Sequence, residues 1–186
     1  MREYLSILMP LLHGKPADFD GETLHAHGAV DVPGATPPQV AIAALGEQML
    51  RLAGTHTEGT VTWMTGPATL EAHTVPIITK AAQDAGRPAP RVAVSLPVCV
   101  TDDPDGAKTM AAQVFQVYGM LPSYRAMLDR EGAEGPSDVA IVGDEATVRA
   151  GIERVASAGA TDFVAAEFGA NAGERTRTRE LLRTLL

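Results

Sequence analysis

The chain has 186 residues, of which 45% are hydrophobic and 20% charged, as is typical of one soluble globular domain and not of a disordered chain. Its formal net charge of −8 offers no basic surface for a nucleic acid or an anionic membrane. No apolar run approaches the ~20 residues that span a bilayer, so we expect a cytoplasmic protein without nucleic acid or membrane partners.

The first forty residues predict a helix followed by a long connection. Apolar residues recur at helical spacing at Leu5, Leu8, Met9 and Leu12. Gly14 and Pro16 then mark the end of this helix, because neither favours its continuation. Residues 18–38 lack periodicity, which predicts a long connection with at most a short extended piece.

From residue 40 onward, short apolar runs alternate with helical stretches. We expect strands at residues 40–45, 60–64 and 92–100, the first of them buried on both faces. We expect helices at residues 47–54, from residue 67 to about residue 85, and at residues 107–118. Pro76 should kink or restart the second helix, and Pro97 should mark a bulge or an end of the strand ladder.

The last third of the chain continues the alternation. A helix is expected at residues 122–130, a loop at 131–137, a helix around Val148, Ile152 and Val155, a strand at 162–168 and a final helix near Leu181. The alternation predicts an α/β fold with a parallel sheet. About four βα units fall short of the ~250 residues of a closed eight-stranded barrel, and an incomplete barrel leaves two sheet edges unpaired.

The turn at residues 43–46 is the strongest candidate for a binding site. It lies between an apolar strand and a helix start, where unpaired N–H groups and the helix dipole favour an anion such as a phosphate. Gly46 lets a ligand approach the backbone, because it has no Cβ. The alternative is that Gly46 only turns the chain.

The turn at residues 65–67 has a similar arrangement one strand later. Thr65 and Gly66 either contact a cofactor or substrate, or Thr65 only caps the helix that Pro67 begins. Trp63, the only tryptophan, either packs inside the fold or stacks against a bound ring.

Other reactive residue types give weaker signals. Cys99 is the only cysteine and is expected to be a buried, inert thiol in a strand. His25 and His27 are expected in a surface loop, and no histidines have metal-ligand spacing, so no metal site is predicted. Glu167, at the end of the last strand, either acts as an acid or base or binds a neighbouring amide or cation. We assign no catalytic residue.

Residues 40–54 (VAIAALGEQMLRLAG) and 58–67 (EGTVTWMTGP) resemble the luciferase-like family of barrel oxidoreductases, most closely its coenzyme F420-dependent branch. Residues 18–22 (DFDGE) resemble the segment before that family's fifth strand. Residues 142–145 (VGDE) and 159–163 (GATDF) resemble its closing pattern. The likeness extends nearly from end to end.

The resemblance implies that residues 1–186 form a single domain, the C-terminal portion of a (β/α)₈ TIM barrel, which starts near the helix after the fourth strand and lacks the first strands. It implies a coenzyme F420 site, or alternatively an FMN site, at the carboxyl ends of the strands. The cofactor-binding residues that it implies are Ala43, Ala44, Leu45, Gly46, Met49, Thr65 and Gly66.

The implied function is that of a flavin- or deazaflavin-dependent oxidoreductase or monooxygenase, which transfers a hydride between the cofactor and a small organic substrate. Two alternatives stay open. One is a non-catalytic partial barrel that pairs its open edges in a homo-oligomer. The other is a barrel lyase that uses the same glycines for a substrate phosphate.

Overall fold

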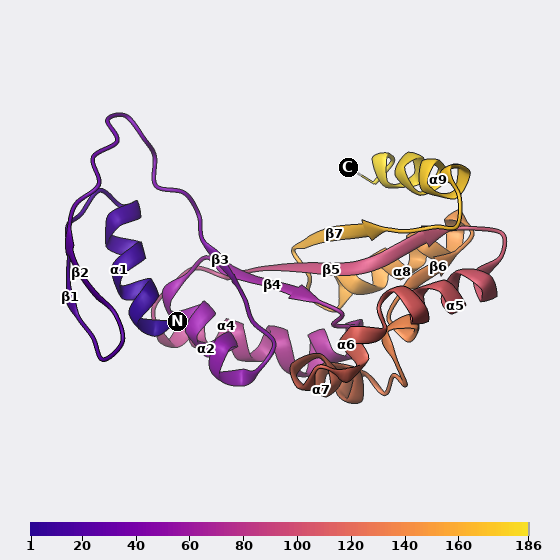
Figure 1. Cartoon of the computed structure of the whole chain (residues 1–186), viewed down its shortest axis with the longest axis horizontal. Helices are drawn as coiled ribbons and strands as arrows, with labels where there is room; N and C mark the ends of the chain where they lie inside the picture. Colours follow the sequence, from indigo (N-terminus) through magenta and orange to yellow (C-terminus); the bar gives the residue numbers. More distant parts are fainter. Residues whose placement is uncertain (186) are drawn as a thin grey trace. The chain divides into compact units, whose positions relative to one another are not determined.

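The computed structural model describes residues 1–185, which divide into two units, residues 1–40 and residues 41–185 (Figure 1). The expectation that the whole chain forms one barrel domain stays a prediction. Among the described residues, no helix has the length and apolarity needed to cross a bilayer.

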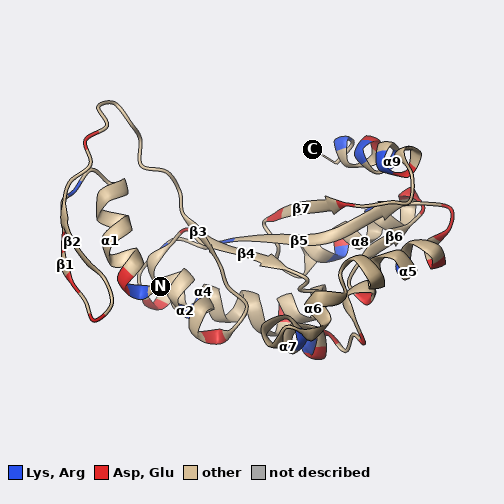
Figure 2. Ribbon diagram, in the orientation of Figure 1, with Lys and Arg blue, Asp and Glu red and all other residues tan. Residues whose placement is uncertain are grey.

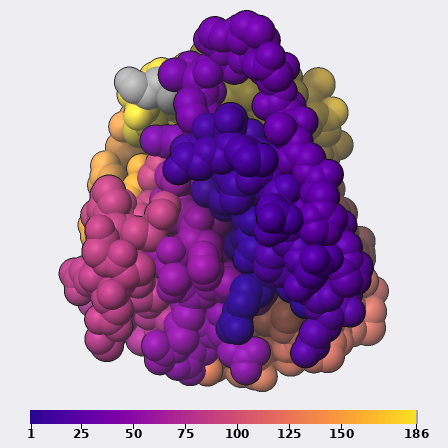
Figure 3. Space-filling view, turned by 90° about the vertical axis from the view of Figure 1, so that its left-hand side faces the viewer, coloured from indigo at the N-terminus to yellow at the C-terminus, as the bar shows by residue number. Residues whose placement is uncertain are grey.

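The first unit consists of one helix and one hairpin. Helix α1 (Arg2–Leu12) confirms the predicted helix. Strands β1 (Ala17–Asp20) and β2 (His25–Gly28) pair antiparallel, which corrects the first part of the expected connection, whereas residues 29–38 form no helix or strand, as expected. Phe19 pairs with Ala26 on the less exposed face of the hairpin. Helix α1 packs on β1, and both belong to the indigo atoms of Figure 3.

The turn of this hairpin is held by Glu3 of α1. Its carboxylate accepts hydrogen bonds from the backbone amides of Glu22, Thr23 and Leu24 at 3.0, 3.1 and 2.9 Å, and from the Thr23 hydroxyl at 2.6 Å. Hydrogen bonds to the ionised form favour it. The Thr23 hydroxyl and amide, with the other two amides, lower the pKa of Glu3 to about 2.

The second unit is built on a five-stranded parallel sheet. Its strands are β3 (Ala41–Ala43), β4 (Gly59–Trp63), β5 (Arg91–Val100), β6 (Ile141–Gly143) and β7 (Asp162–Glu167). Strand β5 is central, because β4 and β6 pair with one of its edges and β7 with the other. Strand β6 was not predicted, so the sheet has one strand more than expected. The sheet is open, and β3, β6 and β7 each pair with only one strand among the described residues (Figure 1).

Helices follow each of these strands. They are α2 (Glu47–His56), α3 (Pro67–Thr69) with the π-helical turn η1 (Leu70–Thr74) and α4 (Val75–Asp84), α5 (Pro104–Val114), α6 (Gln116–Met120), α7 (Pro122–Glu131), the 3₁₀ turn η2 (Pro136–Asp138), α8 (Glu145–Ser157) and α9 (Ala172–Arg183). The predicted restart at Pro76 is confirmed, because α4 begins next to it after the π turn.

Pro97 lies where one edge of β5 changes its partner. On that edge the carbonyl of Ser95 accepts from Met64 just after β4, and the amide of Thr101 donates to Gly143 of β6. Backbone groups of a parallel strand alternate between its two edges, so Pro97 faces this same edge between the two strands. Its missing N–H therefore removes no ladder bond, and the predicted ladder end is confirmed.

The two faces of the sheet differ in their cover. On one face Val98 and Val100 of β5 pack with Val148 of α8 and Leu181 of α9. On the other face Val61 of β4 is 39% exposed and Val164 of β7 is 50% exposed.

The expected burial of the first strand on both faces is wrong. Ile42 is buried, whereas Ala41 and Ala43, on either side of it, are exposed. The apolar run that predicted the strand did not distinguish one covered face from two, because alanine is small enough to occupy either environment.

Candidate functional site

The 43–46 turn connects β3 to α2 as the sequence predicts. Gly46 is the N-cap of α2 with extended backbone angles, and no side chain accepts a hydrogen bond from the first amides of the helix. A Cβ added at Gly46 would have no heavy atom within 4 Å. A ligand can therefore approach the positive end of a ten-residue helix without meeting protein atoms at this position.

The N-terminus of α2 differs from those of the other helices that follow parallel strands. Helices α5, α8 and α9 are capped by Asp103, Asp144 and Asn171, whose side chains accept from backbone amides at 3.0, 2.8 and 3.0 Å. Helix α3 is capped by Glu131 of α7. Among the described residues, α2 alone in this set lacks a side-chain acceptor.

Buried side chains bind the carbonyl groups around the 43–46 turn. The Thr60 hydroxyl donates to the Ile42 carbonyl at 2.9 Å, and His73 Nε2 donates to the Leu45 carbonyl at 3.0 Å. Both side chains are buried. These carbonyl oxygens, which would repel an anion, are thus engaged within the protein, and the turn is held in a fixed conformation.

A cavity of about 350 Å³ lies against this turn. The structure brings five predicted residues together in its wall, namely Ala43, Ala44, Leu45, Gly46 and Met49. The rest of the wall comes from β4 and α7, and consists of Val61, Thr62, Trp63, Ser123 and Tyr124. Strands β3 and β4 carry no charged residue (Figure 2), so the cavity joins an uncapped helix N-terminus to a largely uncharged wall.

Trp63 packs in an aromatic cluster, as one of its two interpretations predicted. Its ring makes edge-to-face contacts with Phe115 and Tyr118, with centroids 5.8 and 5.6 Å apart. Tyr118 in turn contacts Tyr124, with centroids 5.0 Å apart. This packing fixes the two aromatic residues, Trp63 and Tyr124, that border the cavity.

Two residues of the cavity wall carry buried polar atoms without a partner. Thr62 Oγ1 and Trp63 Nε1 form no hydrogen bond with a described residue. Leaving a buried polar group unpaired costs about 1–3 kcal/mol.

Charges near the cavity are arranged around Glu47 in the first turn of α2. Its carboxylate accepts from Arg51 at 2.6 and 3.0 Å, and Arg51 lowers the pKa of Glu47, with smaller contributions from His73 and Arg130. The negative charge of Glu47 is therefore balanced by nearby cations, which limits its repulsion of an anionic ligand.

The 65–67 turn has a different arrangement. The amides of Ala68 and Thr69 donate to the Glu131 carboxylate at 3.1 and 2.7 Å, and a Cβ at Gly66 would lie 2.3 Å from Glu131 Cδ. Thr65 does not cap the helix, which corrects that interpretation: its hydroxyl points to the Trp63 carbonyl at 3.4 Å. Thr65 and Gly66 lie outside the wall of the cavity, so their cofactor contact stays a prediction.

Glu167 and Cys99 are in the less reactive of their possible environments. Both carboxylate oxygens of Glu167 accept from Arg179, which lowers the pKa of Glu167. This confirms the interpretation that Glu167 binds a neighbouring cation, and it makes a proton-donating role unfavourable. Cys99 is buried in β5 as predicted, and burial raises its pKa to about 11.

His25 and His27 lie on the exposed face of the first unit's hairpin, beside two aspartates that the sequence did not connect with them. His27 Nδ1 is 2.7 Å from Asp18 Oδ1, and its Nε2 is 3.1 Å from Asp20 Oδ1. These carboxylates raise the pKa of His27, with the hydrogen bond to Asp18 as the largest cause. No group of three potential ligands that could hold a metal ion occurs among the described residues.

Comparison with known proteins identifies the fold. The structure resembles that of the coenzyme F420-dependent tetrahydromethanopterin reductase from Methanopyrus kandleri, with 22% identity and a TM-score of 0.74 over 97% of this chain and 60% of that one. An F420-dependent secondary alcohol dehydrogenase, solved with an F420–acetone adduct, gives 20% identity and a TM-score of 0.73 over 99% of this chain and 60% of that one.

A third similar structure contains FMN. The oxygenating constituent of 3,6-diketocamphane monooxygenase from Pseudomonas putida, in complex with FMN, gives 19% identity and a TM-score of 0.69 over 97% of this chain and 60% of that one. The chain thus spans about 60% of the length of these structures. Among curated proteins, no sequence matches this one significantly.

The open parallel sheet with its βα units is accordingly part of a (β/α)₈ barrel. The model of the luciferase-like monooxygenase family matches residues 1–184. The chain therefore belongs to the luciferase-like monooxygenase family.

Proposed function

We propose that this chain is the cofactor-phosphate-binding portion of a flavin- or deazaflavin-dependent oxidoreductase that acts on a small organic substrate. Coenzyme F420 is the preferred cofactor and FMN the alternative, because both occur in the similar structures. When bound, either group supplies the hydride-transfer chemistry.

The observation that carries this proposal is the open N-terminus of α2 beside a cavity. Helices α3, α5, α8 and α9 have a carboxylate or amide oxygen at the corresponding place. The acceptor that α2 lacks from its own chain would come from a bound phosphate, which is the ligand that such a helix end favours.

The residues present fit such a group. The first amides of α2 would hold the phosphate, and Gly46 leaves room for its approach. Thr60 and His73 keep the neighbouring carbonyls engaged, so that the amides and not the oxygens face the ligand. Met49, Trp63 and Tyr124 offer an apolar wall that excludes water from a ring system.

The test measures the fluorescence of Trp63, because Trp63 is the only tryptophan of the sequence and borders the cavity. The purified chain is titrated with F420 and with FMN, and quenching of the tryptophan emission is measured. We expect saturable quenching at micromolar concentration for at least one of them. If sugar phosphates quench the tryptophan emission and F420 and FMN do not, the result supports the alternative of a barrel lyase that binds a substrate phosphate.

Gly46→Val provides the decisive variant. Its side chain enters open space, so the fold persists, but it occupies the approach to the α2 amides, and cofactor binding is lost. Gly135→Val is the matched control, since Gly135 is also an N-cap glycine with extended backbone angles and no heavy atom near a Cβ. Equal cofactor affinities of the two variants would contradict the proposed phosphate site.

One observation favours a second possibility, a non-catalytic partial barrel that self-associates. Strands β3, β6 and β7 have no second partner strand among the described residues, and Val61 and Val164 are exposed on the face opposite α8 and α9. Unpaired strand edges promote association. Size-exclusion chromatography tests this possibility, because a sharply monomeric chain argues against edge pairing.

A further inference from the structure

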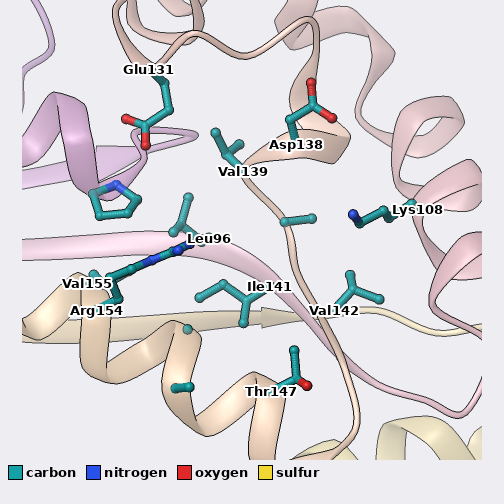
Figure 4. A pocket seen from close by; sticks show the side chains of 14 residues that line it. Leu96, Lys108, Glu131, Asp138, Val139, Ile141, Val142, Thr147, Arg154 and Val155 are labelled. Atoms are coloured by element: carbon teal, nitrogen blue, oxygen red, sulfur yellow. The ribbon is translucent and has the colours of Figure 1, made fainter.

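A second cavity of about 510 Å³ lies beside the covered face of β5, between α5 and α8 (Figure 4). It shares no lining residue with the cavity at the 43–46 turn. Its floor is apolar and consists of Leu96, Val139, Ile141, Val142 and Val155. The volume lies in the range of small-molecule sites, about 300–1,000 Å³.

Two cations reach into this cavity from different helices. Figure 4 shows Lys108 of α5 and Arg154 of α8 extending toward its centre from opposite sides. The structure gives neither side chain a hydrogen bond or ion pair with a described residue. Lys108 and Arg154 are the two cations of a cavity wall that also contains two carboxylates, Glu131 and Asp138.

The two carboxylates in the wall form no ion pair with these cations and are held by backbone amides. Glu131 accepts from the first amides of α3 at 3.1 and 2.7 Å. Asp138 accepts from the backbone amides of Glu134 and Gly135 at 2.8 and 3.2 Å. Both carboxylates are therefore bound to backbone amides, and the N–H groups of Lys108 and Arg154 stay available to a ligand.

We propose that this cavity binds an organic carboxylate with an apolar body. The guanidinium of Arg154 and the ammonium of Lys108 would bind the carboxylate, because both donate charge-assisted hydrogen bonds. The apolar body would cover the floor around Leu96 and Ile141 and remove it from water. An inorganic anion would contact only the two cations, and a neutral apolar molecule would contact only the apolar floor, so each would bind more weakly.

The test is a calorimetric titration of the full chain with three probes. Octanoate carries both features, octanamide has the same body without the charge, and inorganic phosphate has charge without an apolar body. We expect octanoate to bind at least about tenfold more tightly than either of the others, which is the effect of about one charge-assisted hydrogen bond or one buried apolar group.

Variants locate the binding. Arg154→Gln and Lys108→Gln should each weaken octanoate binding about tenfold and leave octanamide binding unchanged, and neither removes a hydrogen bond or ion pair between described residues. Ala150→Phe should weaken both organic probes, because exposed Ala150 of α8 lines the cavity. Arg149→Gln is the matched control on the same helix, since Arg149 lies outside the wall and donates to Thr184 Oγ1 at 3.0 Å.

Three results would overturn the inference. Octanamide or phosphate that binds as tightly as octanoate removes the need for both a charge and an apolar body in the ligand. If octanoate binds equally well to Arg154→Gln, to Lys108→Gln and to the unchanged protein, it binds outside this cavity. If Arg149→Gln weakens octanoate binding as much as Arg154→Gln does, the loss comes from the change in net charge of the chain and not from a contact in the cavity. None of these outcomes bears on cofactor binding at the 43–46 turn.

Discussion

The contact between Glu131 and the start of α3 joins two segments that are 62 residues apart. Glu131→Ala removes both hydrogen bonds, at 3.1 and 2.7 Å, and leaves the amides of exposed Ala68 and buried Thr69 without this partner. Hydrogen bonds to a charged group contribute about 1.5–3 kcal/mol each, and shared solvent exposure reduces the sum. We expect the free energy of unfolding to fall by about 2–4 kcal/mol, and by about half as much for Glu131→Gln, which keeps one acceptor oxygen.

Urea unfolding followed by circular dichroism measures these losses, and for a chain of this size each 1 kcal/mol also lowers the Tm by about 2–4 °C. Glu134→Ala is the control from the same loop, and its side chain is exposed.

Gly66→Ala adds a second perturbation, because its Cβ would displace Glu131. In the Glu131→Ala background Gly66→Ala should cost little more. Additive losses, or equal losses for Glu131→Ala and Glu134→Ala, would refute the assigned contact.

Further predictions follow from buried or constrained groups. Cys99, with a pKa of about 11, should not react with a disulfide reagent at pH 8 in the native protein and should react fully in urea; native reactivity contradicts its burial. Glu3, whose pKa falls from 4.5 to about 2 on folding, stabilises the hairpin turn above pH 4.5, and this contribution is lost as the pH falls toward 2. NMR titration of the turn amides should show this midpoint, and Glu3→Gln should abolish it. Gly54→Ala should destabilise by about 1–3 kcal/mol, since its Cβ would lie 2.4 Å from the Ile78 carbonyl, whereas Gly46→Ala in the same segment should leave the Tm nearly unchanged.

Much of the fold was predictable because its signals are local. Periodicity, with Gly46 and Pro67 at helix starts, located most strands and helices of the second unit. Strand β6 was not predicted, because a strand of three residues that ends at Gly143 is too short to show an alternating hydrophobic pattern. The β1–β2 hairpin was not predicted, because its outward residues are polar and only two apolar residues, Phe19 and Ala26, pair on its inward face.

The candidate site was predictable on one side only. The 43–46 turn carries its own signal, the glycine between an apolar strand and a helix. Ser123 and Tyr124 complete the cavity from α7, 77 residues or more after Gly46, and nothing in their neighbourhood indicates it. The Glu131 contact with α3 is equally non-local, so the difference between the open 43–46 turn and the capped 65–67 turn required the structure.

The central position of β5 also sets an order for folding. Strand β4 precedes β5 in the chain, so these two strands can pair as soon as residue 100 has left the ribosome. The opposite edge of β5 has to wait for β7, whose pairing joins Ala93 to Asp162 and Val98 to Glu167. Until then, a ten-residue apolar strand presents an unpaired edge during synthesis. The nascent chain is therefore most prone to aggregation while residues 101–167 are being made.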